Sequence, residues 1–204
     1  MVRTNGNKCA ANSTARHHAL ACEGRVMAWR EKSRHDEMAK LWARAIRKLD
    51  GCGGVVTENT WAETADGEKV ISDIEFNKSG KQWVLDISLT SPSLPSYSGS
   101  ASKTPESAAV LRWKAKHKKY WMARHSELAA VTPVADQREP SVVPIVFETS
   151  GRLYSESMEW ARDVLFRGEK AKLTSLLTAT SCLMARRVGE ALHEGAVRGL
   201  GSAR

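Results

Sequence analysis

Two aspartates lie in the middle of two neighbouring apolar runs of the sequence. Asp73 is central in VISDIEF (residues 70–76), and Asp86 is central in WVLDISL (residues 83–89). Both runs are rich in the β-branched and aromatic residues that favour strands, and a charge inside a strand costs stability unless it has a partner or a function. The segment NKSG (residues 77–80) supplies the Asn and Gly of a hairpin loop, so we expect the two strands to pair.

The alternation of side chains along these strands decides where the aspartates point. On the first run, Asp73 shares a face with Ile71 and Glu75. On the second, Asp86 shares a face with Ser88, and a suitable register brings both aspartates to one side of the sheet. Two carboxylates at close range raise each other's pKa, and a divalent cation such as Mg²⁺ removes that penalty. The alternatives are that one aspartate pairs with Lys or Arg, or that both face solvent at a sheet edge.

The next helix carries a lysine on its apolar stripe. Within AAVLRWKAKHKKYW (residues 108–121), the stripe comprises Ala109, Trp113, Lys116 and Tyr120. At about 100° per residue these positions fall on one face, and Lys119 lies near its edge. Lys116 is therefore expected to face the sheet between two aromatic rings, where an ammonium needs a negative partner. The alternative is that its aliphatic stem passes the aromatic rings and carries the charge to water.

The elements that hold these residues follow from hydrophobic periodicity. Strands are predicted at Val55–Trp61, Lys69–Phe76 and Gln82–Thr90, and a buried strand that ends in a turn is predicted within Ser141–Gly151. Helices are predicted from about Glu31 to Leu49, from Thr104 to about Ala130, and from Ser155 onward with a break near Gly168. Thr104 is the expected N-cap of the second helix, with Pro105 as its first residue and Glu106 complementing the helix dipole. Strands flanked by helices predict an α/β fold with a mixed central sheet and C-terminal helices.

Composition limits the classes of partner. With 204 residues, the chain can bury the core of one sizeable domain. No apolar run approaches the roughly 20 residues of a membrane span, and the N-terminus lacks the apolar core of a signal peptide. We therefore expect an intracellular protein, nuclear or cytoplasmic and not secreted, with no membrane partner. The net charge of +8 favours a polyanion, nucleic acid first and an anionic membrane second.

The order of these motifs resembles a known pattern. Two acids on adjacent strands, followed by a helix with a lysine, are similar to the PD-(D/E)xK nucleases, and more closely to the restriction-like endonuclease domain at the C-terminus of non-LTR retrotransposon polyproteins. In that domain the second acid lies in a D-V-T/S strand and the lysine comes from a K-x-x-K-Y run in the next helix. The matching segments are SRHDEMAKLWARAIRKL (33–49), SD (72–73), LDISLTSP (85–92), KHKKY (116–120) and VPIVFETSG (143–151). Ser72 stands where the family has proline, and Ser88 stands where the commoner pattern has its lysine.

The resemblance covers about residues 8–155 and implies three parts. These are a degenerate zinc-knuckle-like segment (1–30), a restriction-endonuclease-like core (31–155) and a C-terminal helical extension (156–204). The implied activity is hydrolysis of DNA phosphodiester bonds with Mg²⁺ or Mn²⁺, as in target-site cleavage by a retroelement or a retroelement-derived protein, with DNA or an RNA/DNA complex as partner. The rival hypothesis is a catalytically inactive nuclease-fold protein that binds nucleic acid, and a third is a structural or partner-binding domain.

The resemblance also implies roles for individual residues. Asp73 and Asp86 would hold the metal together with the backbone carbonyl of Ile87. Lys116 would stabilise the charge that develops on the phosphate or position the water, and Tyr120 would contact a phosphate or orient Lys116. Accessory contributions are expected from Glu58, Glu75, Ser88 and Lys119. The remaining matched pair, His35 and Asp36, is interpreted as a structural feature of a helix start.

The N-terminal segment keeps part of a zinc knuckle. KCAANSTARHHALAC (residues 8–22) retains Cys9, His18 and Cys22 with His-x₃-Cys spacing, but the family's second cysteine is absent. A structural zinc site needs four ligands. Two outcomes stay open: His17 completes a Zn²⁺ site, or the site is lost.

Overall fold

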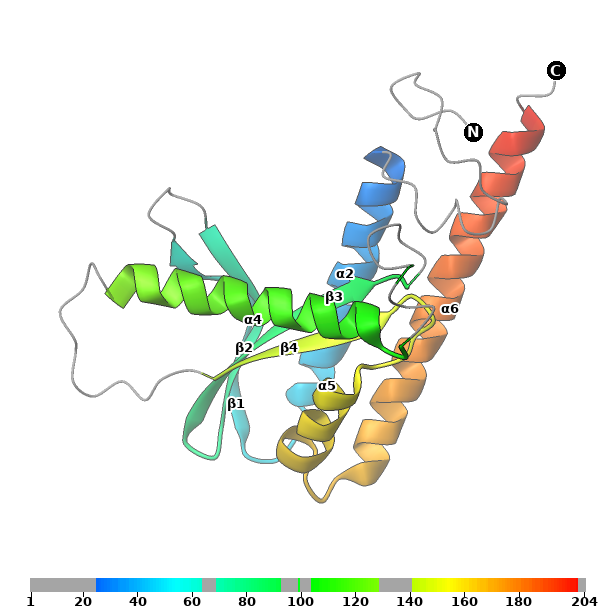
Figure 1. Cartoon of the computed structure of the whole chain (residues 1–204). Helices are drawn as coiled ribbons and strands as arrows, with labels where there is room; N and C mark the ends of the chain where they lie inside the picture. The colour runs from blue at the N-terminus through cyan, green and yellow to red at the C-terminus, as the bar shows by residue number, and fades with distance from the viewer. Residues whose placement is uncertain (1–24, 64–68, 93–98, 100–103, 129–140, 202–204) are drawn as a thin grey trace.

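The computed structural model describes residues 25–63, 69–92, 99, 104–128 and 141–201 (Figure 1). Its helices are α2 (Arg25–Ile46), α4 (Ser107–Leu128), α5 (Ser155–Trp160), the π-helical segment η1 (Ala161–Leu165) and α6 (Lys170–Gly201). Its strands are β1 (Cys52–Glu63), β2 (Lys69–Lys78), β3 (Lys81–Thr90) and β4 (Ser141–Glu148). The candidate zinc residues Cys9, His17, His18 and Cys22 lie outside the described residues.

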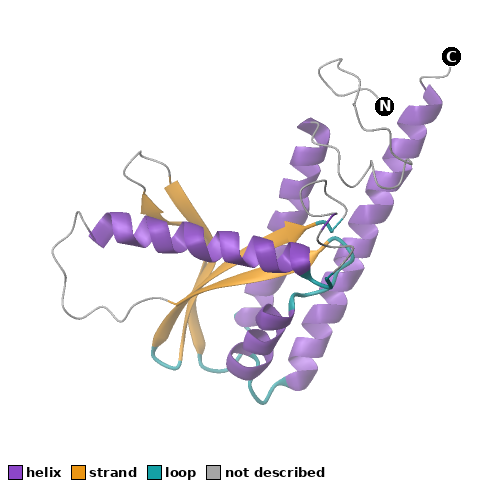
Figure 2. Cartoon of the chain, in the orientation of Figure 1, coloured by secondary structure: helices purple, strands orange, loops and turns teal. Residues whose placement is uncertain are grey.

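The four strands form one mixed sheet in the order β1-β2-β3-β4. β2 is antiparallel to both β1 and β3, whereas β4 is parallel to β3. The parallel pair requires a crossover connection, and α4 lies within it. The prediction of an α/β fold with a mixed sheet flanked by helices is confirmed (Figure 2).

The β2–β3 hairpin has a tighter turn than the predicted loop NKSG. Asn77 already pairs with Gln82, and only Ser79 and Gly80 form the turn, with φ of 53° and 71°. Positive φ at both central residues is the geometry that matches the right-handed twist of the flanking strands. Each strand is therefore longer than predicted.

Helices cover both faces of the sheet. In Figure 1, α4 crosses one face, while α2 and α6 lie behind the other. The larger core joins alternate residues of the strands to α2 and α6: Trp42, Ile74, Phe76, Leu85, Ile87, Ile145, Phe147 and Leu176. On the opposite face, α4 contributes Ala109 and Tyr120 to smaller clusters with Val146 and Val84. The apolar stripes of the helices thus account for the layers.

The start of α4 differs from the predicted cap. Glu106 has a φ of 60°, so the helix begins at Ser107, and Pro105 is not its first residue. The carboxylate of Glu106 instead accepts a hydrogen bond from Ser155 Oγ at 2.5 Å and pairs with Arg152 at 2.8 Å. These contacts hold Glu106 outside the helical conformation and attach the start of α4 to the segment after β4.

The C-terminal helices follow the prediction. α5 and η1 are separated from α6 by a turn in which Gly168 has a φ of 80°, so the predicted break near Gly168 is confirmed. α2 begins at Arg25, earlier than the predicted Glu31. Among the described residues, none of the helices is both long and apolar enough to cross a bilayer.

Candidate active site

The β2–β3 ladder ends just before the two aspartates. The last paired residues at that end are Ile74 and Leu85, and one further step in the same register would place Asp73 opposite Asp86. Instead, the carboxylate of Asp73 accepts a hydrogen bond from the backbone N–H of Ile87, at 2.5 Å from Oδ2. The Asp73 side chain thus occupies the place of a backbone acceptor between the strands.

Asp73 also has no paired residue on the β1 side of β2. The β1–β2 pairing passes from Ile74 to Ser72 without including it. Glu58 lies at the corresponding place in β1 with a φ of 55°, a conformation that is uncommon for a residue other than glycine. Its side chain is exposed, and in the described part of the chain no contact joins Glu58 to either aspartate. β2 is therefore irregular at Asp73, and Glu58 is not brought into the site.

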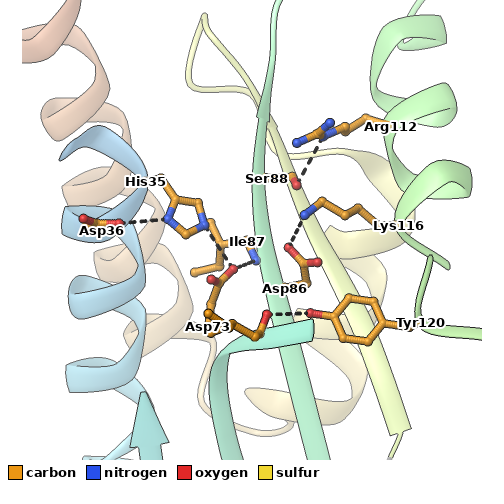
Figure 3. A network of polar contacts seen from close by, with 10 residues as sticks. His35, Asp36, Asp73, Asp86, Ile87, Ser88, Arg112, Lys116 and Tyr120 are labelled. Atoms are coloured by element: carbon orange, nitrogen blue, oxygen red, sulfur yellow. Dashed lines mark hydrogen bonds and ion pairs between the residues drawn. The ribbon is translucent and has the colours of Figure 1, made fainter. Parts of the chain in front are cut away.

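A histidine from α2 reaches Asp73. His35 Nε2 lies 3.1 Å from Asp73 Oδ2, and His35 Nδ1 lies 3.2 Å from Asp36 Oδ1 (Figure 3). The hydrogen bond with Asp73 raises the pKa of His35 to about 9, against the opposing effect of its partial burial. At ordinary pH the imidazole is therefore protonated and donates to both carboxylates.

The helix-start interpretation of His35 and Asp36 is wrong, because α2 begins at Arg25 and both residues lie in its middle. The sequence contained the information that places His35 at the sheet. His35 precedes Met38 by three residues, Met38 precedes Trp42 by four, and both apolar residues are fully buried. His35 extends the stripe that faces the strands.

Lys116 reaches the second aspartate from α4. Its Nζ lies 2.8 Å from Asp86 Oδ1, with side-chain exposures of 18% and 4%. Lys116 lies between Trp113, which packs on Tyr154, and Tyr120, which packs on Trp61. The ammonium is therefore held by a carboxylate on the sheet and is not carried past the rings to water.

Burial raises the pKa of Asp86, and the nearby charge of Asp73 acts in the same direction. The ammonium of Lys116 opposes both effects. The carboxylate of Asp86 therefore depends on neighbouring positive charge to remain ionised.

The two aspartates are engaged from opposite layers. His35 of α2 contacts Asp73 on one side of β3, and Lys116 of α4 contacts Asp86 on the other side (Figure 3). This differs from the predicted common face, because β2 loses regular alternation at Asp73. The carboxylates nevertheless remain close enough for the charge of Asp73 to act on Asp86.

Tyr120 connects α4 to β2. Its hydroxyl donates to the backbone carbonyl of Ile71 at 3.3 Å. Burial, together with the charges of Asp86 and Asp73, raises the pKa of Tyr120 far above its ordinary value, so the phenol stays protonated and acts as a donor. This places Tyr120 as a brace between helix and strand.

Two other predicted accessory residues, Ser88 and Lys119, differ in burial. Ser88 is buried, and its Oγ lies 3.4 Å from Arg112 Nε. Lys119 is exposed, with Nζ 6.0 Å from the centre of the Tyr120 ring. Of these two accessory residues, Ser88 is drawn in Figure 3, where a dashed line joins it to Arg112.

Glu75 is buried within a separate polar group on β2 and β1. Its carboxylate accepts hydrogen bonds from Ser72 Oγ at 2.5 Å and Asn59 Nδ2 at 3.1 Å. These two hydrogen bonds satisfy the buried carboxylate of Glu75 and connect β2 to β1.

The two aspartates suit a magnesium ion by their chemistry. In the part of the chain that the structure describes, no three His, Cys, Asp or Glu side chains form a complete metal cage. Mg²⁺ does not need one, because it is usually bound by one or two carboxylates, waters and substrate phosphates. A cation would also relieve the cost of the buried Asp86 carboxylate, whose pKa burial raises. Ile87 offers its N–H to Asp73, and its role as a carbonyl ligand stays a prediction.

The site therefore combines two buried carboxylates, a histidine, a lysine and a protonated phenol, drawn from α2, β2, β3 and α4. No model of a known protein family matches the chain, and a search of curated proteins finds no similar protein.

Proposed function

We propose that this chain is a metal-dependent endonuclease that hydrolyses DNA phosphodiester bonds, with a restriction-endonuclease-like core formed by β2, β3 and α4. One observation carries the proposal: Asp73 and Asp86 come directly after the last paired residues of the β2–β3 ladder, and Lys116 reaches Asp86 from the next helix. Interrupting the backbone hydrogen bonds of a hairpin and burying two acids there both cost stability, so such an arrangement is unexpected in a purely structural hairpin.

The carboxylates are the proposed metal ligands. Mg²⁺ or Mn²⁺ held by Asp73 and Asp86 would polarise the scissile phosphate and lower the pKa of an attacking water. The chain fixes Asp73 through two donors on Oδ2, the Ile87 N–H and His35, and it fixes Asp86 through Lys116 on Oδ1.

Lys116 is the proposed catalytic cation. In a substrate complex its ammonium lies beside the phosphate that reaches Asp86, so it stabilises negative charge as that charge develops. Tyr120 keeps α4 at a fixed distance from β2 through its bond to Ile71, which makes it a positioning residue. The direct contact of Tyr120 with a phosphate stays a prediction.

DNA is the proposed partner because of the charge of the chain and the position of its lysines. The net charge is +8, and the exposed Lys119 follows Lys116 by about one helical turn, at the edge of the α4 face that covers the site. Lysines in such a position neutralise phosphates and make binding dependent on salt.

Binding without cleavage is the second candidate, and one observation favours it. Asp73 already has His35 as a cationic partner, and Asp86 already has Lys116. A cluster neutralised in this way is stable without a metal, as expected of a nuclease fold that keeps only its affinity for nucleic acid.

Cleavage of a supercoiled plasmid separates the two functions. With Mg²⁺, wild-type protein should produce nicked or linear DNA, and EDTA should prevent it. Asp73→Asn and Asp86→Asn should each lower the rate by about 100-fold or more, because each removes a ligand charge. Lys114→Gln, on the exposed side of the same helix, is the matched control and should keep most of the activity.

DNA binding without cleavage by the folded wild-type protein would select the second candidate. Full activity in either asparagine variant would contradict the assignment of the site.

A further inference from the structure

A second cation on α4 lies beside the proposed site. Arg112 is half-buried, and its Nε donates to Ser88 Oγ at 3.4 Å. Ser88 is almost completely buried, with 1% of its surface exposed. A buried hydroxyl of the sheet thus anchors a guanidinium that comes from the covering helix (Figure 3).

The Arg112–Ser88 contact repeats the Lys116–Asp86 contact one step along both elements. Arg112 precedes Lys116 by four residues on α4, which is about 6 Å along a helix. Ser88 follows Asp86 by two residues on β3, which is about 6.6 Å along a strand and on the same face. The two pairs are therefore parallel, and both face the space between α4 and the sheet.

The charges of the two pairs differ. Lys116 is neutralised by Asp86, whereas within the described residues Arg112 forms no ion pair and its single side-chain hydrogen bond is to the uncharged Ser88. The helix neighbours of Arg112 at three and four residues are Ala108, Ala109, Ala115 and Lys116, so α4 supplies no acid there. An arginine remains charged in proteins, and a half-buried guanidinium favours an anion that its planar fork can bind at two points.

We propose that Arg112, oriented by Ser88, binds a backbone phosphate next to the one that is cleaved. This rests on the proposed nuclease function and adds a named phosphate contact to it. The bond through Nε uses one donor, and the two terminal nitrogens carry the four N–H groups that hold phosphate oxygens in a bidentate contact. Arg112 then fixes the register of the DNA strand across Asp86 and Lys116 without touching the reacting atoms.

The test measures DNA binding in EDTA, so that cleavage is not required. Fluorescence anisotropy with a labelled duplex gives the affinity at several salt concentrations for wild type, Arg112→Gln, Arg112→Lys and the exposed control Lys114→Gln. Arg112→Gln should bind about tenfold more weakly, as expected for a lost charge-assisted contact. The slope of log affinity against log salt should fall by about 0.9, the value for one phosphate contact.

Two conservative variants keep the proposal testable if Arg112→Gln fails to fold. Arg112→Lys retains the charge, so it should keep the wild-type slope while losing affinity through the missing bidentate contact. Ser88→Ala also retains the charge and should weaken binding only a few-fold, because the guanidinium loses its anchor. Circular dichroism establishes that each variant is folded.

The proposal is overturned if wild type binds no DNA, if folded Arg112→Gln has wild-type affinity and slope, or if its loss does not exceed that of Lys114→Gln. A parallel plasmid assay with Mg²⁺ keeps the two proposals separate. If wild type does not cleave but the Arg112 effects on binding appear, the nuclease function fails and the phosphate contact stands.

Discussion

Two groups of charged side chains connect layers of this molecule, and they differ in burial. In the first, which we call the sheet cluster, His35 and Lys116 contact Asp73 and Asp86, and the two aspartate side chains are 12% and 4% exposed. In the second, the helix cluster, Glu37 of α2 contacts Arg186 and Arg187 of α6, and Arg187 also pairs with Glu190. The helix cluster is much more exposed: the Glu37 side chain has an exposure of 33% and that of Arg186 has 59%.

This difference in burial predicts different contributions of the two clusters to stability. Exposed ion pairs are screened by water and contribute about 0–1 kcal/mol each, which is enough to help align two helices. Buried ion pairs cost desolvation, and apolar residues of similar size often replace them without loss of stability. The sheet cluster therefore gains little net stability from its charges. Buried charges that do not increase stability are more often found at functional sites than elsewhere.

The largest effect should come from breaking one ion pair of the sheet cluster. Lys116→Met leaves the Asp86 carboxylate buried without its partner, and we expect a loss of about 3–5 kcal/mol in the free energy of unfolding. Urea denaturation measures this loss. Lys114→Met is the matched control because Lys114 is exposed on the same helix, and it should change stability by less than about 0.5 kcal/mol.

Replacement of both partners then sharpens the comparison. Lys116→Met/Asp86→Leu should recover most of the stability lost by the single variant, because no unpaired charge remains. The double variant should also fail to cleave DNA. A double variant that remains as unstable as the single variant would show that the pair is chiefly structural.

An intermediate effect is expected from pH. The pKa of His35 is raised to about 9, above an unfolded value of about 6.5. Its stabilising contribution is therefore fully present below pH about 6.5 and is lost as the pH rises through about 9. Because the His35 side chain is 30% exposed, we expect a contribution of about 1–2 kcal/mol.

The melting temperatures of wild type and His35→Gln in EDTA measure this contribution. They are compared from about pH 6 to about pH 10, because that range spans the unfolded and folded pKa values of His35. The gap between the two proteins should close as the pH rises. A difference in melting temperature that does not change with pH would mean that the contact with Asp73 does not raise the pKa of His35.

The smallest effect should come from the helix cluster. Arg186→Gln removes an exposed partner of Glu37, and we expect a loss of about 0.5 kcal/mol that disappears in about 1 M salt. Melting temperatures at low and high salt measure it. A loss as large as that of Lys116→Met would remove the distinction between the two clusters.

The features that follow from local periodicity could be predicted from the sequence. The β2–β3 hairpin and the sheet-facing stripe of α4 that carries Lys116 depend on neighbours within a few residues. The mixed sheet follows from the order of strands and helices along the chain. The pairing of Lys116 with Asp86 follows from that stripe because Asp86 lies on the face that α4 covers.

The features that depend on distant contacts could not be predicted in the same way. The helix-start pattern at Glu106 is overridden by Ser155 and Arg152, which are far along the chain. Asp73 leaves the alternation of β2 because its carboxylate finds Ile87 and His35, and neither contact is encoded in the local pattern. His35 was on the apolar stripe of α2, but its charge partner became apparent only with the sheet in place.

The central claim is that Asp73 and Asp86 together bind a divalent cation, and the melting temperature with and without Mg²⁺ tests it most directly. For a dissociation constant tenfold below the Mg²⁺ concentration, binding stabilises the fold by about 1.4 kcal/mol, which corresponds to a rise of about 3–6 °C. We predict this rise for wild type and its absence in folded Asp73→Asn and Asp86→Asn. An equal rise in either variant, or no rise in wild type at any Mg²⁺ or Mn²⁺ concentration, would contradict the claim.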